Sequence, residues 1–371
     1  MVEWKKLGEV CKIHTGSQLN RADMLEDGPY PVVNGGKEYS GFTDRSNENA
    51  NTITISQGGE SAGFVNWINV NFWAGAHCYV IERNDNFNKR YLYHTLKNKQ
   101  RDLQIAKQGA GIPGLNRDTL YKLIIPIPTL SEQNRIVGIL DTFTASIDNL
   151  KEQITQRRKQ YEYYRDQLLD LEGKEGVEMK AMGDLFTFKN GLNKGKEYFG
   201  NGKPIIMFTN VFKSRYIDNS MVNNKVDISE SELERINAHK GDVFFTRTSE
   251  TKEEVGYASV LIEEIEECTF AGFLIRARPV TNTILPTYCK YCFSTPKIRD
   301  SIVSKSSFTT RASLTGASLA EVKLYLPSLQ EQQRIVDILD KFEASIQNLE
   351  AQLSQREKQY EYYRNKLLTF E

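Results

Sequence analysis

Residues 130–172 read LSEQNRIVGILDTFTASIDNLKEQITQRRKQYEYYRDQLLDLE, and residues 329–371 read LQEQQRIVDILDKFEASIQNLEAQLSQREKQYEYYRNKLLTFE. The two stretches align without a gap at a constant offset of 199, and 28 of their 43 positions are identical. A match of this length at one offset indicates an internal duplication. The remainder of the chain falls into two parts, one before each copy.

Both copies carry the pattern of a long helix with an apolar seam. In the first copy, apolar and aromatic residues follow steps of four and three, with one gap at Arg157, at Ile136, Leu140, Phe143, Ile147, Leu150, Ile154, Tyr161, Tyr164, Leu168 and Leu171. The second copy repeats the pattern at Ile335, Leu339, Phe342, Ile346, Leu349, Leu353, Tyr360, Tyr363, Leu367 and Phe370. A 3.5-residue repeat over about five heptads is typical of a coiled coil. We expect the two helices to pair antiparallel; the alternative is that each packs only on its own globular part.

The duplication predicts four segments. They are a globular domain at 1–129, a helix at 130–172, a second globular domain at 173–328 and a second helix at 329–371. The predicted fold class is α+β, with two mixed α/β domains joined by two long antiparallel coiled-coil helices in a pseudo-two-fold internal repeat.

The two globular domains are related only faintly. Gly16 parallels Gly191 at an offset of 175, and Tyr30-Pro31-Val32-Val33 faces Lys203-Pro204-Ile205-Ile206. Strand cores are expected at residues 52–55, 78–81 and 242–245, which are rich in β-branched and aromatic residues. Like helices and unlike globular domains indicate two copies of one partner on the helices and two different ligands on the domains.

Composition narrows the class of protein. The 371 residues are 39% hydrophobic and 11% aromatic, which is enough for buried cores. No run of about 18 apolar residues occurs, and the N-terminus lacks the apolar segment of a secretory signal. Five cysteines, an odd and sparse set, suit a reducing cytosol. We therefore expect a cytoplasmic protein with no membrane partner.

The charge balance at first argues against a nucleic-acid binder, because such proteins usually carry a basic excess. Lys and Arg number 48, and so do Asp and Glu. Divided by segment, the first globular domain holds 15 basic and 13 acidic residues, and the second holds 21 and 19. Each helix holds six basic and eight acidic residues. Any DNA binding by the isolated chain should therefore be weak and poorly discriminating.

Motifs for catalysis or metal binding are not found in the sequence. The glycine-rich stretches at 57–63 and 108–114 lack the Gly-Lys-Ser/Thr of a nucleotide-binding loop, so we interpret them as loops that approach a ligand. Cys289 and Cys292 have the spacing of half a metal site, but no second pair follows, so buried thiols and no metal are expected. No catalytic residue is predicted, and the chain is not expected to be an enzyme.

The loops of both globular domains are instead polar and basic. Arg and Lys side chains can bond guanine, Asn and Gln can bond adenine, and many polar groups can bond phosphate. In the first domain the candidates for DNA contact are Lys12, Gln18, Asn20, Arg21, Lys37, Gln57, Gln108, Asn116 and Arg117. In the second domain they are Lys189, Asn193, Lys194, Arg215, Arg247 and Arg311.

The helices also share identical residues that lie off the seam. A merely solvated face would have drifted as the globular domains did, so we interpret this face as a surface for binding a partner protein. The candidate residues are Gln156, Lys159, Tyr163 and Arg165, with their counterparts Gln355, Lys358, Tyr362 and Arg364.

The repeated Leu-x-Glu-Gln-x-Arg-Ile-Val, at 130–137 and 329–336, resembles the specificity (S) subunit of type I restriction-modification systems. The preceding Pro-Ile-Pro-Thr-Leu does so too. The resemblance covers the whole chain, and it extends more loosely to Gly114-Leu115-Asn116 and Pro204-Ile205-Ile206.

This resemblance implies a non-catalytic DNA-recognition subunit. Residues 1–129 and 173–328 would be target-recognition domains, each reading one half of a bipartite, asymmetric double-stranded DNA target. The helices would space the domains and dock two methyltransferase (M) subunits, with restriction (R) subunits joined through them. The complex would methylate adenine and cleave unmodified DNA. S-adenosylmethionine, ATP and Mg²⁺ would belong to the partners, and this chain would hold no cofactor.

Two other hypotheses remain open at this point. The chain could be a coiled-coil scaffold whose globular domains bind protein. It could also be an enzyme in which Glu60 or Glu250 acts as an acid or base on a loop.

Overall fold

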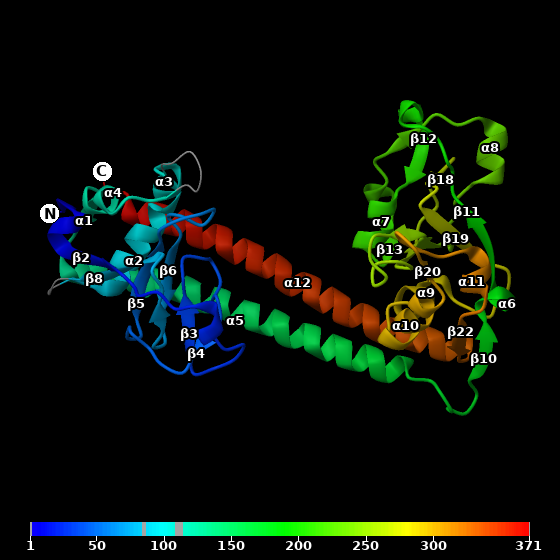
Figure 1. The fold of residues 1–371 in the computed structure, drawn as a ribbon, viewed down its shortest axis with the longest axis horizontal. Coiled ribbons are helices and arrows are strands. Elements are labelled where there is room, and N and C mark those ends of the chain that lie inside the picture. Colours follow the sequence, from blue (N-terminus) through cyan, green and yellow to red (C-terminus); the bar gives the residue numbers. More distant parts are fainter. Residues whose placement is uncertain (1, 84–86, 108–113, 371) are drawn as a thin grey trace. The chain divides into compact units, whose positions relative to one another are not determined.

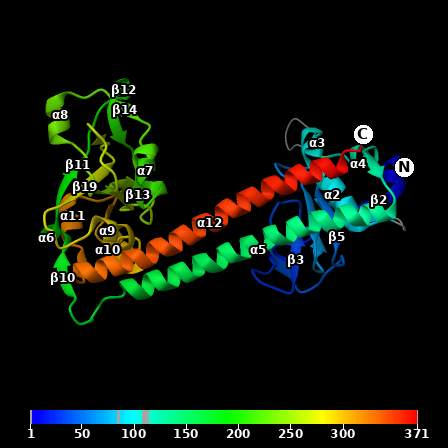
Figure 2. The same ribbon diagram turned by 180° about the vertical axis from the view of Figure 1, so that it is seen from behind.

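The computed structural model describes residues 2–83, 87–107 and 114–370. The chain forms two compact units (Figures 1 and 2). Unit 1 comprises Met1–Glu152 with Leu349–Glu371, and unit 2 comprises Gln153–Asn348. The two long helices, α5 (Leu130–Leu169) and α12 (Leu329–Leu368), therefore each contribute residues to both units.

Unit 1 is built around a four-stranded antiparallel sheet in the order β2-β8-β5-β6. These strands are β2 (Cys11–Thr15), β5 (Thr52–Ser56), β6 (Val65–Ile68) and β8 (Cys78–Arg83). The smaller sheets are β1 (Glu3–Lys6) with β9 (Ile124–Ile127), and β3 (Tyr30–Val33) between β4 (Phe42–Thr43) and β7 (Trp73–Ala74). The short helices are α1 (Leu7–Val10), η1 (Arg21–Asp23), α2 (Lys89–Asn98), α3 (Gln100–Ile105) and α4 (Arg117–Tyr121).

Unit 2 is built around a five-stranded sheet in the order β11-β19-β15-β17-β13. These strands are β11 (Phe186–Asn190), β13 (Tyr216–Ile217), β15 (Val243–Thr246), β17 (Ala258–Leu261) and β19 (Leu274–Pro279). The smaller sheets contain β10 (Glu178–Ala181) and β22 (Lys323–Leu326); β12 (Phe199–Ile206), β14 (Lys225–Val226) and β18 (Thr269–Phe270); and β16 (Thr248–Ser249), β20 (Ser307–Phe308) and β21 (Ala312–Ser313). The short helices are α6 (Met182–Leu185), η2 (Lys196–Tyr198), α7 (Phe208–Lys213), η3 (Asn219–Met221), α8 (Glu230–Arg235), α9 (Pro286–Cys292), α10 (Pro296–Ser304) and α11 (Gly316–Ala320).

The two units share one plan despite their different lengths. The order β2-β8-β5-β6 in unit 1 corresponds to β11-β19-β15-β17 in unit 2. The faint alignment of residues 30–33 with 203–206 is confirmed, because each segment forms a parallel pair: Val33 with Ala74, and Ile206 with Phe270. The strand cores predicted near residues 52, 78 and 243 are confirmed as β5, β8 and β15. The fold is the α+β class that the sequence predicts.

Each unit buries parts of both long helices in its core. In unit 1, Ile136 and Leu140 of α5 and Tyr360 of α12 join the cluster that contains Ile53 and Leu92. In unit 2, Ile335 and Leu339 of α12 and Tyr161 of α5 occupy the corresponding places. Full burial of one such aliphatic side chain contributes about 1.5–3 kcal/mol. The helices therefore pack on the globular domains as well as on each other.

The helices run antiparallel within each unit. In unit 1, Phe143 of α5 stacks on Tyr363 of α12, with ring centroids 5.3 Å apart. In unit 2, Tyr164 of α5 stacks on Phe342 of α12 at 5.4 Å. These are the same contact at the repeat offset of 199, so the sequence duplication is also a duplication of the helix pairing.

A buried glutamine explains the repeated Leu-x-Glu-Gln motif. The Gln133 side chain donates to Pro128 O and accepts from Asn88 N, both at 2.9 Å. The Gln332 side chain donates to Pro327 O at 2.9 Å and accepts from Leu285 N at 2.8 Å. One amide thus joins the start of each long helix to the first turn of α2 or α9. The Glu and Arg of the motif pair on the surface, where such pairs contribute little.

Within the described part of the chain, none of the helices combines the length and the apolar character needed to span a bilayer.

Replacing Gln133 by Ala should lower the free energy of unfolding of unit 1 by about 1–3 kcal/mol, because Asn88 N loses its buried acceptor. The measurement is chemical denaturation of the full chain, followed through unit 1. The control is Gln355→Ala, which removes an exposed glutamine from α12 within the same unit. A loss no larger than that of the control would contradict the role of Gln133.

Candidate nucleic-acid interface

Four loops of unit 1 meet at one end of its main sheet. Gln57 N donates to His77 O at 3.0 Å, and Leu115 N donates to Gln57 O at 2.7 Å. Gly16 N donates to Cys78 O at 3.1 Å and brings the loop after β2 to the same place. We call Gly16, Gln57, His77 and Leu115 the junction of unit 1.

Unit 2 repeats this hydrogen-bond pattern. Arg247 N donates to Phe273 O at 2.8 Å, Leu314 N donates to Arg247 O at 2.9 Å, and Gly191 N donates to Leu274 O at 3.2 Å. The junction of unit 2 is therefore Gly191, Arg247, Phe273 and Leu314. The backbone frames correspond bond for bond, but the side chains at the centre differ: Gln57 and His77 in one, Arg247 and Phe273 in the other.

A glycine is required at the same point of both frames. A Cβ atom on Gly16 would lie 2.1 Å from Ala74 O, and one on Gly191 would lie 2.1 Å from Ala271 O. Backbone cannot move aside as a flexible side chain can, so only glycine allows this approach. The predicted equivalence of Gly16 and Gly191 is confirmed.

Aromatic and basic side chains surround the junction of unit 1. The Tyr79 hydroxyl donates to Leu115 O at 2.9 Å, and the Arg117 guanidinium lies 5.8 Å from the Tyr79 ring centroid. Burial raises the pKa of Tyr79, and the charge of Arg117 opposes that rise. The indole N–H of Trp73 donates to Ser17 O at 2.9 Å, and Arg45 lies 5.1 Å from the Trp73 ring centroid.

The structure brings several predicted DNA-contacting residues of unit 1 together. Gln57 belongs to the junction, Asn116 and Arg117 follow its Leu115, and Gln18 lies two residues beyond Gly16. The loop of Lys37 also reaches the junction, since a Cβ atom on Gly35 would lie 2.7 Å from His77 O.

The remaining predicted residues of unit 1 lie elsewhere. Lys12 is exposed within β2, opposite Glu82 of β8. Asn20 and Arg21 are exposed at the start of η1. Gln108 lies outside the described residues. Direct contact of all these residues with DNA stays a prediction.

The predicted residues of unit 2 divide in the same way. Arg247 belongs to the junction, and Asn193 lies beside it, because a Cβ atom on Gly272 would be 3.6 Å from Asn193 Cα. Arg311 lies in the turn between β20 and β21, 3.7 Å from Glu250. Lys189 is exposed on β11.

Two predicted residues of unit 2 are engaged inside the protein. Lys194 donates to Asp227 O at 3.0 Å and to Glu232 at 2.8 Å, and its hydrogen bond lowers the pKa of Glu232 to about 2. Arg215 bonds the Tyr161 hydroxyl of α5, and it pairs with Glu343 of α12 at 2.8 Å. Arg215 thereby links the sheet of unit 2 to both helices, and its contact with DNA stays a prediction.

Three exposed ring-bearing residues at these surfaces were not among the predicted DNA-contacting residues. Phe273 is 59% exposed at the junction of unit 2, and Phe308 is 50% exposed on the β20–β21 hairpin with Lys252 5.7 Å from its ring centroid. His77 is exposed at the equivalent place in unit 1. An isolated exposed aromatic residue forms no repeating pattern in the sequence. His77 and Phe273 can therefore be recognised only from the backbone hydrogen bonds that the two junctions share.

The predicted partner-binding residues repeat their surroundings in the two units. Tyr163 is 61% exposed and lies edge-on to Tyr164; Tyr362 is 59% exposed and lies edge-on to Tyr363. Gln156, Lys159, Gln355 and Lys358 are exposed on the same helices.

The two arginines of this set are half-buried. Arg165 bonds Asp166 at 2.8 Å, and Arg364 bonds the Asn98 side chain at 3.2 Å. Arg364 thereby joins α12 to α2, whereas Arg165 pairs with the next residue of its own helix. The docking of a partner on any of the eight residues stays a prediction.

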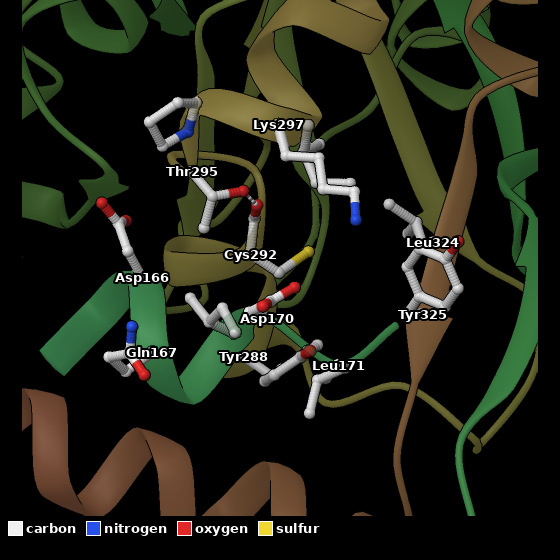
Figure 3. A pocket seen from close by; sticks show the side chains of 13 residues that line it. Asp166, Gln167, Asp170, Leu171, Tyr288, Cys292, Thr295, Lys297, Leu324 and Tyr325 are labelled. Atoms are coloured by element: carbon white, nitrogen blue, oxygen red, sulfur yellow. Dashed lines mark hydrogen bonds between the residues drawn. The ribbon is translucent and has the colours of Figure 1, made fainter. Parts of the chain in front are cut away.

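The structure also contains a pocket of about 350 Å³ in unit 2, lined by the end of α5, by α9 and α10 and by β22 (Figure 3). Leu171, Tyr288 and Leu324 supply apolar walls, while Asp166 and Asp170 supply carboxylates. None of the predicted DNA-contacting residues lines this pocket.

The cysteines and acidic residues form no metal centre among residues 2–83, 87–107 and 114–370, where no group of three or more His, Cys, Asp or Glu could hold an ion. Cys289 and Cys292 are buried free thiols of α9, as expected. Burial raises the pKa of Cys292 to about 12, so its thiol stays neutral. Glu250, considered above as a catalytic group, is exposed and lies near Arg311.

Comparison with known proteins decides the family. The family model described as the type I restriction modification DNA specificity domain matches residues 1–157 and 174–357. The chain belongs to this family. The matched ranges cover both globular domains and most of both helices, so the family resemblance seen in the repeated helix starts is confirmed.

Named relatives agree with this membership. A type I restriction enzyme specificity subunit of Haemophilus influenzae is 28% identical over 386 residues, covering 100% of this chain and 96% of the relative. The EcoR124I/EcoR124II specificity subunit of Escherichia coli is 28% identical over 402 residues, covering 100% of this chain and 94% of the relative.

Solved structures show the same fold. The S subunit of a type I restriction-modification system from M. genitalium superimposes with a TM-score of 0.64 at 21% identity, covering 100% of this chain and 97% of that one. A chain from a structure of type I restriction-modification complex assembly gives a TM-score of 0.61 at 17% identity, covering 99% and 97%. The chain thus shares the fold of these two proteins of known structure.

Proposed function

We propose that this specificity subunit reads a bipartite, asymmetric DNA target, with residues 1–129 reading one half and residues 173–328 the other. The observation that carries the proposal is the pair of junctions. Two backbone frames agree bond for bond while the side chains at their centres differ. A protein that must recognise two different sequences with one kind of domain needs this combination of a common scaffold and variable loops.

The proposal includes two M subunits docked on the helices, one at each exposed tyrosine. Tyr362 lies on Tyr363, which stacks on Phe143; Tyr163 lies on Tyr164, which stacks on Phe342. Each exposed tyrosine ring therefore packs against a ring that is itself held in the contact between the two helices. An exposed tyrosine with a rigid base is a typical binding hot spot, and two equal sites fit two copies of one partner.

The remaining chemistry is assigned to the partners. We propose that the M subunits methylate adenine with S-adenosylmethionine, and that R subunits join through them and cleave unmodified DNA with ATP and Mg²⁺. Near-neutral globular domains favour this division, because the partners can supply the phosphate attraction that dominates non-specific affinity. The complex would act in the cytoplasm, on the DNA of the cell and on incoming DNA.

Exchanging residues 1–128 for the first domain of another specificity subunit should change one half of the methylated target and leave the other half intact. The measurement is sequencing of methylated adenines in cells that express the hybrid chain with its M subunits. The unexchanged chain is the control. A target that changes in both halves, or in neither, would contradict the assignment of one domain to each half.

Replacing Tyr163 and Tyr362 together by Ala should weaken M-subunit binding about tenfold or more at each site, because each site loses its exposed aromatic anchor. Binding is measured by titration, and stoichiometry by size exclusion with light scattering. Tyr39→Ala, which removes a tyrosine 48% exposed in unit 1, is the matched control. Full-strength binding of two M subunits by the double variant would show that these rings are not the docking site.

A further inference from the structure

The side chains at the centres of the two junctions are the strongest candidates for base contacts. Gln57 in unit 1 and Arg247 in unit 2 make the same two backbone hydrogen bonds, one through N–H and one through C=O. Their backbones are therefore held in place from both sides. A side chain on such a fixed backbone can meet the same part of a DNA groove in both domains.

The Arg247 guanidinium is held less tightly within the protein than the guanidinium of Arg278 on β19. Its hydrogen bond to Gly272 O is long, at 3.4 Å. By contrast, the Arg278 guanidinium makes two bonds of 2.7 Å to Asp242. The N–H groups of the Arg247 guanidinium are thus only weakly bonded within the protein. They remain able to donate to an acceptor on a bound ligand.

A residue with an exposed ring is hydrogen-bonded through its backbone to each of the two residues, Gln57 and Arg247. Phe273 follows Gly272 and is 59% exposed, although its backbone oxygen is bound to Arg247 N. His77 has the same relation to Gln57 in unit 1. In unit 1 the Tyr79 hydroxyl donates to Leu115 O at 2.9 Å, and Leu115 N in turn donates to Gln57 O.

The chemistry of these two side chains points to different bases. A guanidinium bonds the O6 and N7 acceptors of guanine in the major groove, whereas a carboxamide bonds N6 and N7 of adenine. We infer that Arg247 reads a guanine in the half-target of unit 2, and that Gln57 reads an adenine at the equivalent place in the half-target of unit 1. This inference rests on the proposed function and adds which residues set the specificity.

The test uses the full chain expressed with its M subunits and reads the target from methylated adenines across genomic DNA. In the Arg247→Gln variant, preference for guanine at one position of one half-target should fall about 10- to 100-fold, with adenine gaining there. Arg247→Lys keeps the charge but loses the fork, and it should also relax that position. The other half-target should not change in either variant.

Arg235→Gln is the control, since it removes one exposed arginine from α8 of the same unit. The reciprocal Gln57→Arg should shift one position of the other half-target from adenine to guanine. If the two Arg247 variants leave the target unchanged, or weaken all sequences equally with a smaller salt dependence, Arg247 contacts phosphate or no DNA and the inference is overturned. A wild-type complex that methylates no bipartite target would instead overturn the proposed function itself.

Discussion

The pairing of the two long helices is the interaction on which the rest of the structure depends. Phe143 on Tyr363 and Phe342 on Tyr164 set one register for the antiparallel pair in both units. Each aromatic contact adds about 0.5–1.5 kcal/mol to the burial of its rings. Since each unit takes core residues from both helices, neither unit has a complete core without the pair. The same rings also support Tyr362 and Tyr163, so folding and the proposed partner docking would share one set of contacts.

The buried side-chain amides of Gln133 and Gln332 attach the paired helices to the globular domains. Each joins a helix start to the backbone of α2 or α9 through buried hydrogen bonds. A buried polar group without its partners is costly, so few other side chains satisfy this site. The Leu-x-Glu-Gln motif is therefore a structural joint, and its presence twice follows from the need to attach two domains in the same way.

The two long helices could be predicted from the sequence, but the two junctions could not. The helix repeat has one offset, 199, because an insertion of anything but a whole heptad would shift the apolar seam out of register. The junction residues have several: Gln57 and Arg247 are 190 apart, and His77 and Phe273 are 196 apart. Because the loops differ in length, a sequence alignment does not pair Gln57 with Arg247 or His77 with Phe273. The backbone hydrogen bonds show that these residues are equivalent. Residue type alone selected Gln57 and Arg247, but it also selected Arg215 and Lys194, whose partners within the protein could not be foreseen.

We propose that the length of the helix pair sets the spacing of the two half-targets and that the helices take no part in base recognition. The most direct measurement is the methylated target of a chain with seven residues inserted into each helix, between Glu152 and Gln153 and between Asn348 and Leu349. One heptad keeps the seam and adds about 10 Å, or about three base pairs. We expect both half-targets unchanged and a spacer longer by about three base pairs. Altered half-targets, or an unchanged spacer in a fully active complex, would contradict the claim.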